Sequence, residues 1–595
     1  MTHRVVATAG HVDHGKSALV LALTGTDPDR WPEEKARGLT IDLGFAATSL
    51  PSGREVAFVD VPGHVRFLKN MLAGVGAVDA CLFVVAATEG WKPQSEEHLS
   101  ILSVLGMRTG LVALTKVGLV DDDLRELARM ELDEHLTGTF LHDAEVVEVD
   151  APTGRGVDAV RAALDRLLDR TPTAHDAGRP RLWVDRSFSA RGAGTVVTGT
   201  LAGGALSVDD ELAVVGDDRP PSRRRRAENG EPVRAPAGHA VRVRGLQSLG
   251  RTLRQVGPGH RVAVNLAGID HRRVARGHAL VRAEQWHGAT VVDASLQVLA
   301  ALDHPMSRRG AYLAYIGSGE HPVRLRVLGP AAVAPGTTGL VRLHLPVALP
   351  LSPGDRYVLR ESGRDETVGG GEVLDVAPVL KASAAQPDRS VDRVIAERRW
   401  VRAGDLEVLT GVQRQPDLGP WVVAPEARHH AAERIAALVV DAGPLGLAPA
   451  SLSEPDRLVL ASLVGHGVEM VDGRARPSEA ADPLADHPYL AALRATPFMP
   501  PPPDGVDRAE LRASVQRGLV VERDGVWFAA SAVQQAIDVV ARQRDEHPEG
   551  FTVSQAREAL GTTRKWAVPL LSLLDASGAT RRRGDVRIAG PRLRA

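Results

Sequence analysis

The apolar residues of the first 170 positions alternate between short continuous runs and helical spacing. The continuous runs have the length of buried strands and lie at Val5–Ala9, Val56–Val61, Cys81–Ala87, Gly110–Lys116 and Val146–Ala151. Amphipathic stretches, with apolar residues three and four positions apart, separate them. Strands that alternate with helices predict a doubly wound α/β sheet, which we assign to residues 1–173.

The pattern changes twice further along the chain. After a linker-like stretch at 171–180, short β-runs broken by glycine and proline predict two β-barrels, at 180–285 and 286–380. Beyond residue 380, three segments share one order: an amphipathic helix, a glycine, a short strand, a tight turn and a second strand. These segments are 458–474, 511–527 and 570–587. A helix followed by a β-hairpin is the back half of a winged helix, so we expect winged-helix domains over 381–595.

Composition narrows the class of protein. The chain has 595 residues, a net charge of −2 and one cysteine, Cys81, inside an apolar run. A single buried cysteine excludes intrachain disulfides and zinc sites built from several cysteines. With no signal peptide and no run of about 18 apolar residues, we expect a cytoplasmic, monomeric protein without membrane contacts. Only seven of the 72 basic residues are lysine, which draws attention to Lys16, Lys116 and Lys565 as places where a compact ammonium is needed.

A phosphate-binding segment lies at the N-terminus. Residues 10–17, GHVDHGKS, follow a predicted strand and open a predicted helix, which is the context that a P-loop requires. Backbone N–H groups would surround the phosphates, Lys16 would neutralise the β- and γ-oxygens, and the Ser17 hydroxyl would bind Mg²⁺. The predicted nucleotide-binding residues here are Asp13, His14, Gly15, Lys16, Ser17 and Ala18.

Two further segments supply what a γ-phosphate sensor needs. Residues 37–41 are RGLTI and residues 60–64 are DVPGH. Thr40 would complete the Mg²⁺ shell with a mobile hydroxyl, Asp60 would act as the outer carboxylate, and the backbone N–H of Gly63 would contact the γ-phosphate. We therefore predict Ser17, Thr40 and Asp60 as the metal site.

The chain resembles the translational GTPases of the elongation factor Tu superfamily in five segments. These are 10–17, 37–41 and 60–64, together with residues 64–74 (HVRFLKNMLAG) and 93–98 (PQSEEH). The resemblance implies GTP and GDP as ligands and Mg²⁺ as cofactor. It assigns His64 to positioning the attacking water, with Val12 and Leu39 as an apolar gate. Orientation and electrostatics, more than general-base strength, would then account for phosphoryl transfer.

The sequence departs from this superfamily at the guanine pocket. The family pattern Asn/Thr-Lys-x-Asp appears as Thr115-Lys116-Val117-Gly118, so the carboxylate that pairs with guanine is missing. Asp121 and Asp122 lie just downstream and are candidates to replace it. The later Ser-Ala element is altered to a segment that begins Asp150, Ala151, Pro152, and we expect these residues to contact the nucleotide.

The rest of the chain resembles the selenocysteine-specific elongation factors. Residues 181–199 and 257–268 resemble the second domain of the superfamily, and 354–375 resembles the third domain of the selenocysteine-specific factors. Residues 551–587 resemble their terminal winged helix, which grips an mRNA hairpin. Residues 551–595 contain nine basic and three acidic residues. We predict Arg564, Lys565, Arg581 and Arg582 as the mRNA contacts.

The same resemblance places Asp185, Arg186 and Arg261 in the pocket for the selenocysteinyl group. A selenol is far more acidic than a serine hydroxyl, so two guanidinium groups would favour the selenolate and gain nothing from serine. The resemblance implies selenocysteinyl-tRNA, an mRNA stem-loop and the ribosome as partners, with GTP-dependent delivery at UGA codons.

Two other functions are also consistent with the sequence. The same barrels occur in the GTPase subunit of sulfate activation, although the basic winged-helix tail argues against that assignment. The altered guanine pocket would also fit an RNA-binding adaptor that does not hydrolyse GTP. The run Arg223–Arg226 is interpreted as part of a solvated loop in preference to an RNA contact.

Overall fold

The computed structural model describes residues 3–29, 31, 33–34, 40–64, 67, 70–72, 78–216, 238–479 and 484–593. Leu39 and Arg223–Arg226 lie outside these residues. The chain divides into two compact units, Met1–Val422 and Val423–Ala595. Within the described residues, no helix combines the length and apolar character needed to cross a membrane.

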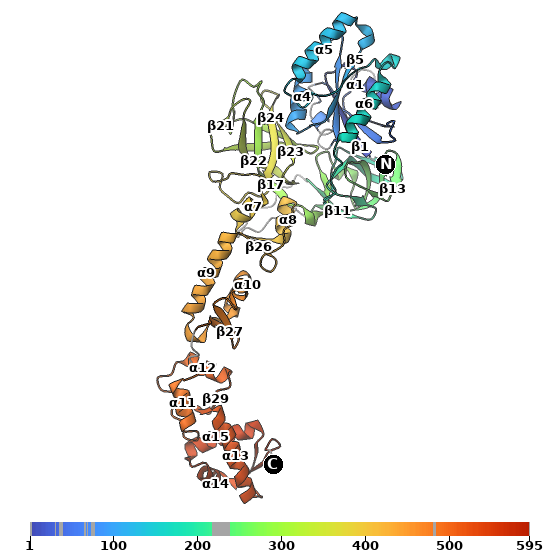
Figure 1. Cartoon of the computed structure of the whole chain (residues 1–595). Helices are drawn as coiled ribbons and strands as arrows, with labels where there is room; N and C mark the ends of the chain where they lie inside the picture. Colours follow the sequence, from blue (N-terminus) through green and yellow to red (C-terminus); the bar gives the residue numbers. More distant parts are fainter. Residues whose placement is uncertain are drawn as a thin grey trace. The chain divides into compact units, whose positions relative to one another are not determined.

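The N-terminal domain is a six-stranded sheet with helices on both faces (Figure 1). Its order is β2-β3-β1-β4-β5-β6, and every neighbouring pair is parallel except β2 with β3. The elements are β1 (His3–Ala9), α1 (Lys16–Thr24), β2 (Gly44–Ser49), β3 (Glu55–Asp60), β4 (Ala80–Ala86), α4 (Pro93–Val104), β5 (Gly110–Thr115), α5 (Asp122–Leu136), β6 (Val146–Glu148) and α6 (Val157–Arg170). The predicted α/β class is confirmed.

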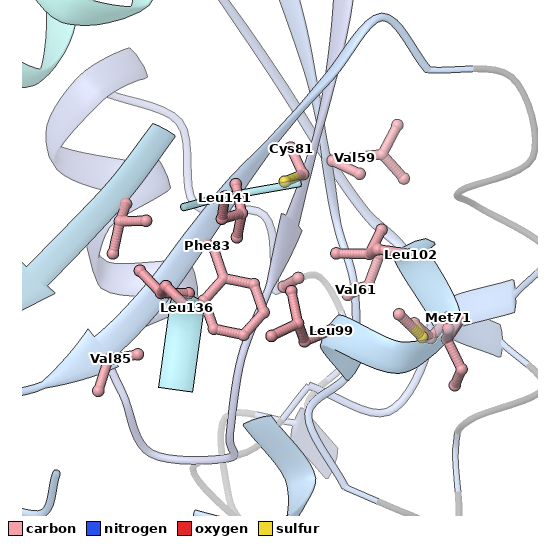
Figure 2. Packing of buried hydrophobic residues seen from close by; sticks show 14 of the residues in the cluster. Val59, Val61, Met71, Cys81, Phe83, Val85, Leu99, Leu102, Leu136 and Leu141 are labelled. Atoms are coloured by element: carbon pink, nitrogen blue, oxygen red, sulfur yellow. The ribbon is translucent and has the colours of Figure 1, made fainter. Parts of the chain in front are cut away.

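Two apolar cores hold this sheet between its helices. One core packs α4 and α5 against one face, and the other packs α1 and α6 against the opposite face. Figure 2 shows the first core, where Phe83 and Cys81 of β4 lie among Leu99, Leu136 and Leu141. Burial raises the pKa of the Cys81 thiol to about 12, so the side chain stays a neutral apolar group. Both faces are covered, which explains the continuous apolar runs of β4 and β5.

Two β-barrels follow, as predicted. Strand pairing closes the first as β11-β16-β7-β9-β15-β12 and the second as β17-β22-β20-β19-β23-β24. The first uses β7 (Arg181–Trp183), β8 (Arg186–Ala190), β9 (Gly194–Ala202), β10 (Leu206–Ser207), β11 (Glu211–Val215), β12 (His239–Ser248), β13 (Arg251–Leu253), β14 (Gln255–Val256), β15 (Arg261–Ala267) and β16 (Ala279–Val281). The second uses β17 (Gly288–Val298), β18 (Met306–Ser307), β19 (Tyr312–Ile316), β20 (Gly319–Leu328), β21 (Ala332–Val333), β22 (Thr338–Pro350), β23 (Arg356–Glu361) and β24 (Glu366–Asp375).

Polar contacts fix the second barrel against the α/β domain. Glu97 of α4 accepts hydrogen bonds from Arg360 at 3.0 Å and from Thr367 at 2.9 Å. Tyr315 and Val358 of the barrel belong to the same apolar core as α4. Helix α4 therefore packs against both the α/β sheet and this barrel.

The rest of the chain is mainly helical. The first unit ends with α7 (Val391–Arg398), β25 (Trp400–Arg402) and α8 (Ala403–Thr410), and β26 (Trp421–Val423) lies at the division. The second contains α9 (Pro425–Asp441), α10 (Glu454–Leu463), β27 (Val468–Val471), β28 (Arg474–Pro477), α11 (Pro488–Ala495), α12 (Arg508–Gln516), β29 (Val520–Arg523), β30 (Val526–Ala529), α13 (Ala530–Glu546), β31 (Phe551–Thr552), α14 (Val553–Ala559), α15 (Arg564–Ser577), β32 (Thr580–Arg583) and β33 (Val586–Ala589).

The predicted helix–hairpin repeat is present three times, after α10, α12 and α15. The first two hairpins turn through Asp472-Gly473 and Asp524-Gly525, and all four residues have positive φ. Two consecutive residues of this kind form the tight turn that suits the twist of a hairpin, which is why Asp-Gly appears there. The third hairpin turns at Gly584-Asp585, and only the glycine has positive φ.

Candidate functional site

The phosphate-binding loop lies at the carboxyl edge of the sheet. It connects β1 to α1, and β1 lies between β3 and β4, where the order of strands reverses. This is the usual ligand crevice of an open α/β sheet. Lys16 is buried, and its ammonium donates to the carbonyls of Gly10 and His11 at 3.1 and 2.7 Å. Burial lowers the pKa of Lys16 to about 8, and phosphate charge would restore its preference for the charged form.

The other residues predicted from this loop have different environments. Asp13 is exposed with a φ of 64°, and Ala18 is exposed on the first turn of α1. His14 is buried, and burial lowers its pKa to about 4, so it serves as a neutral packing group. The carbonyl of His14 accepts a 2.6 Å hydrogen bond from Thr115, which ties the loop to the end of β5.

Oxygen atoms of the three predicted metal ligands converge beside Lys16. The Ser17 hydroxyl donates to Asp60 at 2.7 Å and lies 2.9 Å from the Thr40 hydroxyl. Thr8 also donates to Asp60, at 2.6 Å. Burial raises the pKa of Asp60, and the hydrogen bonds from Thr8 and Ser17 and the charge of Lys16 partly offset that shift. Hydroxyl and carboxylate oxygens are the donor set that Mg²⁺ prefers.

Sequence reasoning did not identify Asp29 at this site. Its carboxylate accepts a 2.9 Å hydrogen bond from the Thr40 hydroxyl, and burial raises its pKa. Asp29 lies in the segment after α1, for which the sequence offers no motif. Asp29 therefore holds the predicted switch threonine from outside the recognised segments.

The segment that contains Gly63 and His64 packs directly on the phosphate-binding loop. A Cβ atom at position 63 would lie 2.6 Å from the backbone nitrogen of Val12 and would also collide with the Lys16 ammonium. Only glycine allows this approach. His64 follows at once, partly exposed, with its ring 6.0 Å from that of Phe67. His64 and Val12 thus flank the same contact, while Leu39 lies outside the described residues.

Helix α4 supplies a second contact to the loop that the motifs did not reveal. The Nδ1 atom of buried His98 accepts a 3.1 Å hydrogen bond from the N–H of Gly10. Burial, reinforced by the nearby Lys16 charge, lowers the pKa of His98 to about 3. Gln94, one turn earlier, lies within 3.5 Å of the Val12 nitrogen. The sequence signal for this contact is the i, i+4 spacing of Gln94 and His98, which places both side chains on one face of a helix.

The predicted base-contacting residues lie at the ends of β5 and β6. Lys116 has a left-handed backbone, and its ammonium pairs with Glu89 at 3.2 Å. Asp150 is buried at the start of a short 3₁₀ turn, Ala151–Thr153, in which Pro152 is exposed. Asp121 instead caps α5 by accepting the N–H of Leu124 at 2.9 Å, and Asp122 pairs with Arg125.

The three residues predicted for the cargo pocket lie together on the first barrel. Arg261 makes a two-pronged ion pair with buried Asp185, at 2.6 and 3.0 Å. Asp185 also accepts the Thr198 hydroxyl at 2.6 Å. These bonds hold the Arg261 guanidinium in one orientation, which favours recognition of a fixed anionic group.

Arg186 and Arg261 line a cavity of about 370 Å³ between this barrel and strands β2 and β3. The guanidinium carbons of Arg261 and Arg186 lie 3.5 and 4.6 Å from the centre of the Phe45 ring. Phe188 contributes a further apolar wall. The cavity therefore combines aromatic walls with two cations, which suits a small anionic side chain.

Arg186 and a further arginine, Arg276, contact the segment that follows Thr40. Asp42 pairs with Arg276 at 2.7 Å and with Arg186 at 3.5 Å, and Arg186 also donates to the carbonyl of Leu43. Arg276 further donates to Asn70 at 2.6 Å. A change in the position of the Thr40 segment would therefore alter the surroundings of the cavity. Sequence reasoning missed Asp42, Phe45 and Arg276 in this role.

The predicted RNA-binding residues occupy one end of the second unit. Arg564 and Lys565 are exposed in the first turn of α15, and the Lys565 ammonium lies 5.3 Å from the centre of the Trp566 ring. Arg581 and Arg582 are exposed on β32, an edge strand of the three-stranded sheet β31-β33-β32. By contrast, Arg587 is buried and pairs with Asp575 at 3.0 Å. Helix start and hairpin thus both expose basic side chains.

Family models match both ends of the chain. Residues 1–170 match the elongation factor Tu GTP binding domain, and residues 542–589 match the winged helix of elongation factor SelB. A crystal structure of a bacterial selenocysteine-specific elongation factor, EF-Sec, is similar with a TM-score of 0.71 and 25% identity, over 99% of this chain and 100% of that one.

Two curated relatives extend the similarity. The selenocysteine-specific elongation factor of Escherichia coli is 30% identical, with 98% of both chains aligned. That of Desulfomicrobium baculatum is 38% identical over 62% of this chain, and the match spans 55% of its own length. The chain therefore belongs to the selenocysteine-specific elongation factors, a family of translational GTPases.

Proposed function

We propose that this GTPase carries selenocysteinyl-tRNA to the ribosomal A site at UGA codons and binds an mRNA stem-loop through its terminal winged helix. The observation that carries the proposal is the cavity lined by Arg186 and Arg261. Its two guanidinium groups suit a selenolate, while a neutral serine hydroxyl would gain no comparable charge interaction. Delivery of the tRNA would take place in the cytoplasm, where ribosomes are found.

Ser17, Thr40 and Asp60 would hold Mg²⁺ in this proposal, because their oxygen atoms already lie within hydrogen-bonding distance. The ion would neutralise charge on the β- and γ-phosphates. Lys16 would bind the same phosphates, and His64 would orient the attacking water. Phosphate release would free the Thr40 segment, whose neighbour Asp42 contacts Arg186 and Arg276. The cargo cavity would then lose one wall, which links hydrolysis to tRNA release.

A reconstituted translation system tests this function. The mRNA should contain an in-frame UGA codon followed by the stem-loop of a selenoprotein message from the source organism. With the full chain, GTP and selenocysteinyl-tRNA, we expect a full-length product. Removing the stem-loop or replacing GTP by GDP should abolish it. A full-length product of equal yield without the chain would refute the proposed function.

The exposed basic residues of α15 give a prediction for RNA binding. Replacing Arg564 and Lys565 together by glutamine should weaken binding of the full chain to that stem-loop and flatten the dependence of log affinity on log salt by about one to two units. Each lost phosphate contact accounts for about 0.7 to 0.9 of that slope. Filter binding at several salt concentrations measures both quantities.

A matched control removes two charges elsewhere in the same region. Arg557 lies in the last turn of α14 with its side chain 41% exposed, and Arg592 lies beyond β33 and is exposed. The Arg557→Gln, Arg592→Gln variant should keep most of the affinity and slope. If the two double variants lose affinity equally, binding depends on overall charge, and the assignment of α15 is wrong.

A further inference from the structure

Gly118, which stands where the superfamily has an aspartate, lies against the carboxylate of Asp150. Strands β5 and β6 are parallel, with Leu114 opposite Glu148, so the segments that follow them emerge at the same edge of the sheet. A Cβ atom at Gly118 would lie 2.8 Å from Oδ2 and 3.2 Å from Cγ of Asp150. The Asp150 carboxylate therefore occupies the space that a side chain at position 118 would enter.

Asp150 is held firmly in this place. Its backbone N–H donates to the carbonyl of Arg155 at 2.9 Å, and its Oδ2 accepts the Thr153 hydroxyl at 2.6 Å. The residue is only 6% exposed. Among the residues that the structure describes, no cationic side chain forms an ion pair with Asp150. A buried carboxylate with only one hydroxyl donor on its side chain is costly unless further donors reach it.

We propose that Asp150 is the residue that selects guanine. Its carboxylate accepts hydrogen bonds from the N1–H and the 2-amino group of the base, and Gly118 is the compensating change that leaves room for it. Thr115 and Lys116 keep their places beside the phosphate-binding loop and Glu89. The proposal deepens the nucleotide site of the GTP binding domain and does not depend on tRNA delivery.

The two aspartates expected from the sequence have other roles. Asp121 uses its carboxylate as the cap of α5, and Asp122 is exposed and pairs with Arg125 on the same helix. Asp150, 32 positions after Gly118 in the sequence, is close to it only because β5 and β6 are neighbours. Capping and surface pairing give Asp121 and Asp122 a structural purpose, whereas the side chain of Asp150 has one donor and an open second oxygen.

Asp150→Asn tests the assignment with an isosteric side chain. Xanthine carries a 2-oxo group where guanine has an amino group, so the asparagine amide can donate to xanthine and opposes guanine. We expect affinity for GDP to fall roughly 10- to 150-fold and affinity for xanthosine diphosphate to rise. Fluorescent-nucleotide titrations of the full chain, without tRNA or ribosomes, measure both dissociation constants. Asp121→Asn is the matched control and should bind both nucleotides as the wild type does.

A relocation variant separates base recognition from loop structure. Asp150→Ser alone should lower GDP affinity. Adding Gly118→Asp should raise that affinity again by at least about tenfold, because an aspartate at position 118 places its carboxylate in the space that the Asp150 carboxylate occupied. Unchanged GDP affinity in Asp150→Asn, or equal losses for GDP and xanthosine diphosphate, would overturn the assignment. If guanine selection passes these tests while selenocysteinyl-tRNA is not preferred, only the proposed cargo function fails.

Discussion

His64→Ala is expected to lower ribosome-stimulated GTP hydrolysis by at least about 100-fold while GTP affinity stays within about twofold of wild type. In the proposed site, Lys16 and Ser17 hold the nucleotide and its Mg²⁺, so binding should survive the loss of the His64 ring. Hydrolysis depends on the placement of one water molecule, and a displacement of about 1 Å at a reacting group can cost about 100-fold. Single-turnover hydrolysis with ribosomes and an equilibrium nucleotide titration measure the two effects.

The control for this prediction is His142→Ala. The His142 side chain is 56% exposed in the segment before β6 and contacts none of the residues described at the nucleotide site. It should hydrolyse GTP at the wild-type rate. If His64→Ala does the same, His64 has no part in the reaction and the water must be oriented by another group. A matching loss of GTP affinity would instead indicate that His64 supports the packing of Gly63 on the loop.

Arg261→Ala and Arg186→Ala should each weaken binding of selenocysteinyl-tRNA to the GTP form by roughly 10- to 150-fold, which corresponds to about 1.5–3 kcal/mol for a charge-assisted contact. Binding of the same tRNA charged with serine should change little, because serine offers no charge to either guanidinium. Arg261→Lys should recover only part of the loss, since lysine keeps the charge but cannot reproduce the two-pronged pair with Asp185.

Arg242→Ala controls for general loss of positive charge on the barrel. The Arg242 side chain is 61% exposed on β12 and lies 3.9 Å from Asp209. This variant should bind both charged tRNAs as the wild type does. Thermal unfolding must accompany the Arg261 variants, because truncation leaves Asp185 buried without its partner. Equal losses for selenocysteinyl- and seryl-tRNA would show that the arginines serve the tRNA body and not the cargo.

The sequence was informative wherever a function resides in one contiguous segment. The phosphate-binding loop and the DVPGH segment could be placed because each fixes a backbone geometry that few residue types allow, as Gly63 illustrates. The three helix–hairpin units were predictable for the same reason, since helix period and tight turns with Asp-Gly or Gly-Asp are local signals.

Contacts between distant segments could not be predicted in this way. Arg276 meets Asp42 across 234 positions, and the contact depends on how the first barrel packs on the α/β domain. Asp150 was expected near the nucleotide only as part of an altered element, and its approach to Gly118 follows from the pairing of β5 with β6. Asp121 and Asp122 were attractive because they were close in sequence, but helix capping determines where the Asp121 carboxylate points.

The most direct test of cargo selection compares two charged forms of one tRNA on the unmodified chain. The tRNA that carries selenocysteine, and the same tRNA charged with serine, should be titrated separately against the chain saturated with a non-hydrolysable GTP analogue. We predict at least about a tenfold preference for the selenocysteinyl form. This preference should shrink as falling pH protonates the selenolate, and it should vanish when the chain is loaded with GDP instead of the GTP analogue. Equal affinities for the two forms with the GTP analogue would contradict the proposed cargo selection.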